Sequence, residues 1–128
     1  MLKKYVELVC ADASGDADVY TAPMTGKLLA IRMIPHGTAP CANTLDVVIA
    51  HYLDASVYVY LWAEDNLAAT AAWIRPRFDA TDNDNSTSRS TAETNVCEPY
   101  ELADDRLRII LAQAGASKKA LFEFIVEE

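Results

Sequence analysis

The feature that most constrains this chain is the alternation of side chains in residues 106–114 and 119–127. Each run carries one apolar row of a single parity: Leu107, Ile109 and Leu111 in the first, and Phe122, Phe124 and Val126 in the second. Successive side chains of a strand point to opposite faces, so each run predicts a strand with one buried face. The Gly-led tetrapeptide 115–118 between them predicts a hairpin turn and antiparallel pairing of the two strands.

The rest of the chain repeats this strand character in short segments. They are residues 5–10, 18–22, 27–34, 45–52, 57–62, 73–77 and 99–102. Residues 23–26, from Pro23 to Gly26, predict a chain reversal, and the alanines after Glu64 favour one or two helical turns in residues 64–72. Pro76 predicts an edge strand or an extended arm, because proline cannot donate to a strand ladder. Residues 79–95 hold no apolar side chain larger than alanine and predict a long polar loop.

These segments predict an all-β protein: an antiparallel β-sandwich or jelly-roll of eight or nine short strands. With 128 residues, we expect a single domain over 1–128 that buries its own core.

The charge balance excludes two classes of partner. Lys and Arg total 11 against 19 Asp and Glu, a formal net charge of -8. Nucleic-acid binding needs a basic stripe, so neither nucleic acid nor an anionic membrane is an expected partner. The first residues enter a strand pattern directly and do not resemble a signal segment, so we expect synthesis in the cytoplasm.

An aromatic row marks the candidate interface. In residues 57–62 the aliphatic side chains have one parity and Tyr58, Tyr60 and Trp62 the other. Such a row fits cross-strand packing within the domain, and it also fits a subunit or partner interface, where Tyr and Trp are enriched. The full set of interface candidates is Tyr58, Tyr60, Trp62, Trp73, Arg75 and Arg77.

Candidate chemistry is sparse, and we expect no enzyme, cofactor or metal. The chain has no nucleophile elbow, and a catalytic base would have to be His36, in a loop, or His51, expected as a half-exposed strand residue. Cys41 with His36 lacks any orienting group. One calcium-loop register exists in the polar loop: Asp82, Asp84, Ser86, Ser88, Ser90 and Glu93. It has Thr87 where that loop requires glycine, and no flanking helices are expected.

Four short segments carry a family resemblance. They are residues 26–31 (Gly-Lys-Leu-Leu-Ala-Ile), 73–77 (Trp-Ile-Arg-Pro-Arg), 98–108 (Glu-Pro-Tyr-Glu-Leu-Ala-Asp-Asp-Arg-Leu-Arg) and 112–115 (Ala-Gln-Ala-Gly). In order and spacing they resemble a family of small virion proteins that tailed bacteriophages encode next to the major capsid gene. Residues 79–95 depart from that pattern, in which a shorter, glycine-containing loop is expected.

The resemblance implies a β-sandwich on the outer surface of the capsid, which decorates or cements the head shell. The implied partner is the major capsid protein, and the implied assembly is a homo-oligomer, with a trimer favoured. Arg75 and Arg77 would then pair with acidic capsid residues. Two alternatives stay open: another virion component, such as a tail tube or tail tip, and a non-enzymatic β-sandwich module that binds carbohydrate or calcium.

Overall fold

A computed structural model of the protein describes residues 1–67, 72–79 and 97–128, and within them the chain is all-β. It forms ten strands there: β1 (Leu2–Cys10), β2 (Ala17–Tyr20), β3 (Met24–Pro35), β4 (Leu45–Tyr52), β5 (Tyr58–Leu67), β6 (Ala72–Ile74), β7 (Arg77–Asp79), β8 (Cys97–Asp105), β9 (Arg108–Ala112) and β10 (Lys119–Glu127). The described part of the chain contains no helix long and apolar enough to cross a membrane.

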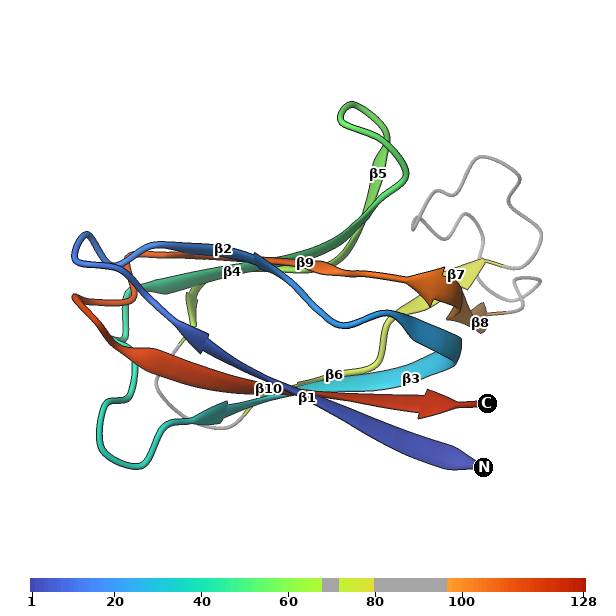
Figure 1. The fold of residues 1–128 in the computed structure, drawn as a ribbon, viewed down its shortest axis with the longest axis horizontal. Coiled ribbons are helices and arrows are strands. Elements are labelled where there is room, and N and C mark those ends of the chain that lie inside the picture. Colours follow the sequence, from blue (N-terminus) through green and yellow to red (C-terminus); the bar gives the residue numbers. More distant parts are fainter. Residues whose placement is uncertain (68–71, 80–96) are drawn as a thin grey trace.

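The strands form two packed antiparallel sheets, which Figure 1 shows one above the other. Sheet A has the order β1-β10-β3-β8-β7, and β6 also pairs with β3. Sheet B has the order β2-β9-β4-β5. The predicted fold class, an antiparallel β-sandwich, is confirmed.

The core lies between the inner faces of the two sheets. Phe122 and Phe124 of β10 are fully buried on one side, and Ile109 and Leu111 of β9 are fully buried on the other. These side chains belong to the two apolar rows of the sequence, so the prediction of which face of each strand is buried is correct.

The predicted pairing of these two strands is wrong. β9 pairs with β2 and β4 in sheet B, whereas β10 pairs with β1 and β3 in sheet A. Residues 113–118 therefore cross between the sheets, and the two apolar rows face each other across the core. Backbone hydrogen bonds hold this crossing in place. The Ala114 N–H donates to the Gly15 carbonyl, and the Ala114 carbonyl accepts from the Ala42 N–H.

The chain does turn back between β2 and β3, as expected (Figure 1), but the predicted separate turn at Pro23–Gly26 is wrong, because β3 already begins at Met24. Gly26 lies within this strand at φ +129°, where it passes close to β10. Residues 64–67 belong to β5 and not to a helical turn, because Leu67 pairs with Leu45 and so continues the ladder.

The segment around Pro76 was expected to lie at an edge. The structure divides it into two strands of three residues: β6 pairs with β3, and β7 pairs with β8 at the end of sheet A. This division brings the number of strands in the described residues to ten, where eight or nine were expected for the chain. The long polar loop, apart from Asp79, and the calcium register within it lie outside the described residues.

Candidate binding surface

The outer face of sheet B carries four tyrosines around one arginine. Tyr20 comes from β2, Tyr52 from β4, Tyr58 and Tyr60 from β5, and Arg108 from β9. Strand register brings them together, because Arg108 pairs with Tyr20 on one side and with Ala50 on the other, and Ala50 pairs in turn with Tyr60. We call these five residues, the four tyrosines and Arg108, the tyrosine surface.

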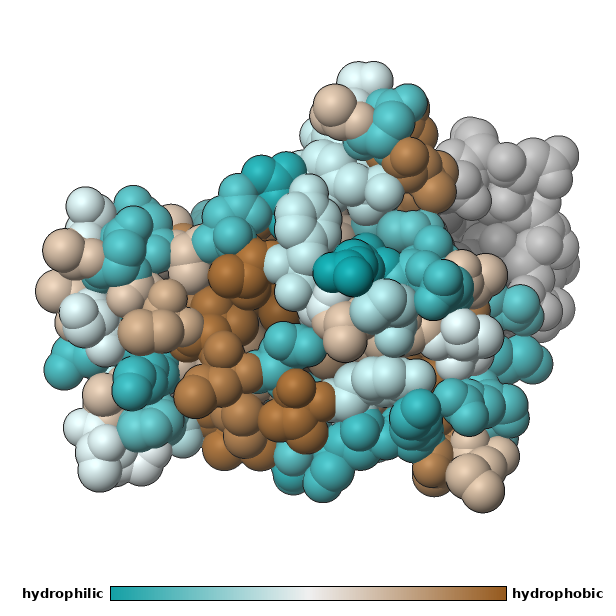
Figure 2. All heavy atoms as spheres, viewed as in Figure 1, coloured by the Kyte–Doolittle hydropathy of each residue, from teal (hydrophilic) through white to brown (hydrophobic). Residues whose placement is uncertain are grey.

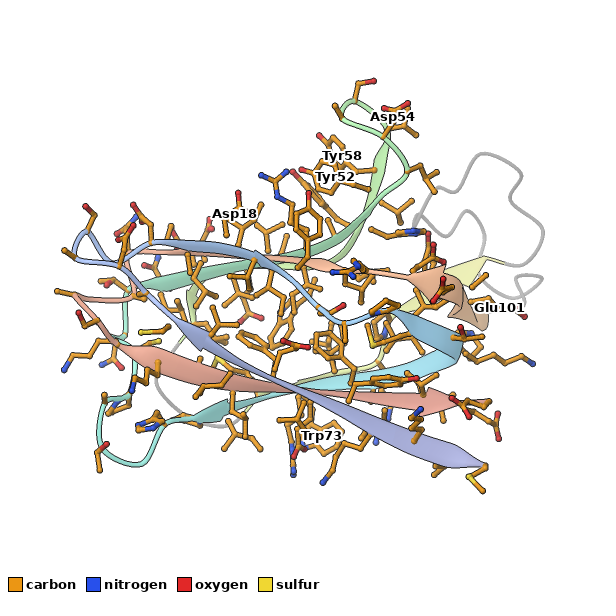
Figure 3. The ribbon with its side chains drawn as sticks, in the orientation of Figure 1. Asp18, Tyr52, Asp54, Tyr58, Trp73 and Glu101 are labelled. Atoms are coloured by element: carbon orange, nitrogen blue, oxygen red, sulfur yellow. The ribbon has the colours of Figure 1, made fainter. Side chains whose placement is uncertain are left out.

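Three rings of the tyrosine surface, those of Tyr52, Tyr58 and Tyr60, form a continuous row. Tyr52 stacks on Tyr58 with 4.9 Å between ring centroids, and Tyr58 lies 5.0 Å from Tyr60. Figure 3 shows Tyr52 and Tyr58 side by side on the outer side of sheet B. Tyr20, Tyr58 and Tyr60 are each roughly half exposed. Rings ordered in this way offer a large contact area and lose little conformational freedom when a partner binds.

Arg108 holds the row together and is itself fixed by Asp18. Its guanidinium lies 4.9 Å from the ring centroid of Tyr52 and 5.9 Å from that of Tyr20. Its Nε donates to Asp18 Oδ1 at 2.8 Å, and its second nitrogen donates to Oδ2 at 2.5 Å. This two-pronged geometry is the strong form of an ion pair and sets the plane of the guanidinium.

The ion pair predicts a pH dependence. Hydrogen bonding to Arg108 lowers the pKa of Asp18 below its ordinary value and raises the pKa of Arg108. The contribution of Asp18 to stability is therefore complete above the ordinary carboxyl pKa of about 3.9 and is lost as the pH falls through the lower native value. We expect an NMR titration to show the pKa of Asp18 rising in Arg108→Leu but not in Arg106→Leu, a matched change in an exposed loop. Equal pKa values in all three proteins would contradict this assignment.

Only two of the six predicted interface residues, Tyr58 and Tyr60, lie on this surface. Trp62 was expected beside them, but it is 5% exposed and packs edge-to-face against Phe122 in the core. The cause is a β-bulge: Ala50 pairs with Tyr60 and Ile49 pairs with Trp62, which leaves Leu61 as the extra residue. A bulge reverses the parity of the side chains that follow it.

The remaining candidates lie elsewhere. Trp73 is exposed on the opposite outer face, that of sheet A, where the Arg32 guanidinium lies 4.9 Å from its ring centroid. Arg75 is exposed directly after β6. Arg77 begins β7, and its side chain is outside the described part of the structure. The six candidates therefore do not form one surface.

The sequence analysis missed Tyr20, Tyr52 and Arg108. Each lies on a segment predicted as a strand and has a parity opposite to a buried neighbour: Thr21 for Tyr20, His51 for Tyr52 and Ile109 for Arg108. Parity could have placed each of them on an outer face. The assembly of all three into one surface depends on the strand order β2-β9-β4-β5, which parity does not contain.

His51 was expected to be half exposed, and this is wrong. It is 6% exposed, with Nδ1 2.5 Å from the Tyr100 hydroxyl and Nε2 3.2 Å from Asp105 Oδ1. His51 belongs to sheet B and its two partners to sheet A, so the three groups connect the sheets. Burial raises the pKa of Tyr100, which keeps its phenol protonated at neutral pH. A protonated phenol is a hydrogen-bond donor and a poor nucleophile, so the arrangement suits a structural bridge.

The Cys41 and His36 pair does not form a thiol–base arrangement. Cys41 is buried, and burial raises the pKa of its thiol, which disfavours the nucleophilic thiolate. His36 Nδ1 accepts the backbone N–H groups of Thr38 and Ala39 at 3.2 and 3.1 Å. Its ring therefore stabilises its own loop.

No family model and no curated protein sequence matches the chain. Among solved structures, the crystal structure of FlhE aligns over 99% of this chain and 98% of its own, with a TM-score of 0.43 and 8% identity. A structure of the infectious bursal disease virus Gx strain aligns over 98% of this chain and 36% of its own, with a TM-score of 0.31 and 10% identity. Likenesses this remote carry no argument about function.

Proposed function

We propose that this protein is a capsid decoration protein of a tailed bacteriophage. In this proposal it binds the outside of the head shell and stabilises contacts between major capsid subunits. The family resemblance of its four sequence segments supports the phage assignment. The structural observation that carries the binding role is the tyrosine surface, a half-exposed aromatic row on a rigid sheet.

The chemistry of this surface suits a protein partner. Tyrosine and arginine are among the residues most enriched where alanine substitution weakens protein interfaces. Asp18 already neutralises Arg108, so the surface presents rings and hydroxyls and little net charge. Such a surface can become buried without leaving an unpaired charge, which would cost several kcal/mol.

Sheet A gives the proposal a second contact region. Trp73 and Arg75 are exposed on or beside β6, away from the tyrosine surface, and Arg75 can pair with acidic capsid residues. A decoration protein that touches two neighbouring capsid subunits would use both faces, and two linked contacts bind more tightly than either alone.

The proposal predicts a loss of head binding without a loss of folding. We expect Tyr60→Ala and Tyr58→Ala each to weaken co-sedimentation with purified heads by about tenfold or more, since hot-spot tyrosines contribute about 2 kcal/mol. Their melting temperatures should stay close to that of the unmodified protein, because both side chains are exposed.

Trp73→Ala is the matched change of an exposed aromatic residue on the other face. If it abolishes head binding while the two tyrosine variants bind normally, the tyrosine surface is not the main contact. Binding to isolated tails but not to heads would favour a tail tube or tail tip component. Binding to neither, with a melting shift on adding carbohydrate or calcium, would favour the non-enzymatic module and contradict the capsid proposal.

A further inference from the structure

β1 forms one edge of sheet A. Its nine residues pair with β10 without a register shift, and among the described residues no strand pairs with its other side. The other long edge strand, β5, has two register shifts in its pairing with β4. β1 also contains no proline, so an unbroken row of backbone donors and acceptors faces outward.

The outer face of β1 carries exposed apolar side chains. Leu2, Val6 and Leu8 are all exposed on its outer face. Figure 2 shows apolar side chains gathered over the middle of β1 and towards β2. Exposed apolar side chains next to an unpaired strand edge are the usual conditions for strand addition.

We propose that a second copy of this chain pairs with β1 in antiparallel orientation and continues sheet A across a two-fold axis. The axis passes through Tyr5, so that Tyr5 lies opposite Tyr5 of the second copy. Lys3 of each copy then lies opposite Glu7 of the other, and Leu2 lies opposite Leu8. One contact therefore contains two opposite-charge pairs and two leucine pairs.

The charges on β1 select this register. A two-fold axis perpendicular to the sheet keeps each face continuous, so only registers that pair residues of equal parity are possible. A shift of two residues in one direction places Lys4 opposite Lys4. A shift of two residues in the other direction removes the pairs of Lys3 with Glu7. A shift of four residues in that direction places Glu7 opposite Glu7. Like charges directly opposite each other destabilise a strand pair, and opposite charges stabilise it.

The existing contacts of Lys3 and Glu7 leave both side chains able to form these pairs with a second copy. Lys3 Nζ lies 3.7 Å from Glu128 in an exposed ion pair, a type that contributes little to stability. Glu7 Oε2 accepts the backbone N–H of Ala22 at 3.1 Å, and a carboxylate can accept several further bonds.

This inference is independent of the proposed function. The dimer contact is the β1 edge of sheet A, and the tyrosine surface is the outer face of sheet B, so pairing leaves the tyrosines accessible. The contact joins chains in pairs, which differs from the trimer that the family resemblance implies.

A charge-exchange experiment tests the pairing on the intact chain of 128 residues. Sedimentation equilibrium should show a dimer for the unmodified protein. In Lys3→Glu and in Glu7→Lys, like charges meet twice across the axis, so each variant alone should associate about tenfold more weakly or worse. An equimolar mixture brings a chain that is acidic at both positions opposite a chain that is basic at both. Both opposite-charge pairs then return, so the mixture should dimerise like the unmodified protein.

Arg106→Glu is the matched control, since it also reverses the charge of one side chain, in an exposed loop, and should leave the dimer intact. Circular dichroism melting of each variant confirms that it is folded before the mixture is made. A monomer at all concentrations, a trimer, or two weakened variants whose mixture does not recover would each overturn the proposal. Recovery in the mixture cannot come from a general loss of folding, because only the cross-chain pairing restores opposite charges.

Discussion

Trp62→Ala is expected to lower the free energy of unfolding by about 3–5 kcal/mol, the usual cost of truncating a buried aromatic side chain. Trp62 is almost fully buried, and its ring packs edge-to-face on Phe122 with centroids 6.5 Å apart. The change also removes the indole N–H that donates to Glu64 Oε1 at 3.1 Å. The cavity would open between the two sheets, where the surrounding strands are held by their ladders and can close only part of it.

Urea denaturation measures this effect, and Tyr60→Ala on the same strand is its control. Tyr60 is half exposed, so its loss should change the free energy of unfolding by about 1 kcal/mol or less. The two variants should therefore show opposite patterns: Trp62→Ala loses stability, and Tyr60→Ala loses head binding. A stable Trp62→Ala protein that no longer binds heads would return Trp62 to the interface and contradict its place in the core.

Gly26→Ala is expected to lower the free energy of unfolding by about 2–5 kcal/mol, from overpacking together with backbone strain. A Cβ at this position would lie 2.5 Å from the backbone oxygen of Glu127 and 2.7 Å from Val126 Cγ1. The residue has φ +129°, which side chains other than glycine rarely adopt. It lies next to Lys27, which pairs with Glu127 of β10, so β3 and β10 would have to separate at that point.

Gly37→Ala provides the control for this prediction. A Cβ at Gly37 would meet no atom within 4 Å, so the change should be neutral or slightly stabilising. Thermal unfolding of the two variants compares the positions directly. Equal melting temperatures would show that β3 and β10 are not as close at Gly26 as the structure places them.

The sequence predicted strands and faces well because alternation is a local property. Ile109 and Phe122 were assigned to buried rows from their immediate neighbours, and both are fully buried. Strand pairing depends on where distant segments lie. The Gly115 connection has the residues of a hairpin, yet it crosses between sheets. The reason is that β10 pairs with β1 and β3, which both lie far from it in the sequence.

The candidate site was predicted less well, for two physical reasons. A single extra residue at Leu61 turned Trp62 from the outer face into the core, and alternation cannot detect such a bulge in advance. The tyrosine surface takes residues from all four strands of sheet B. Tyr20 and Arg108 are far apart in the sequence and meet only because β2 pairs with β9.

The position of β10 between β1 and β3 has a consequence for how the protein is made. Among the described strands, β10 leaves the ribosome after all the others, and both β1 and β3 require it as their neighbour. Until it arrives, β1 and β3 have no partner between them, and their apolar side chains remain accessible to other nascent chains. We therefore expect sheet A to be completed only after residues 119–127 have left the ribosome, with any assistance from a chaperone needed before that point.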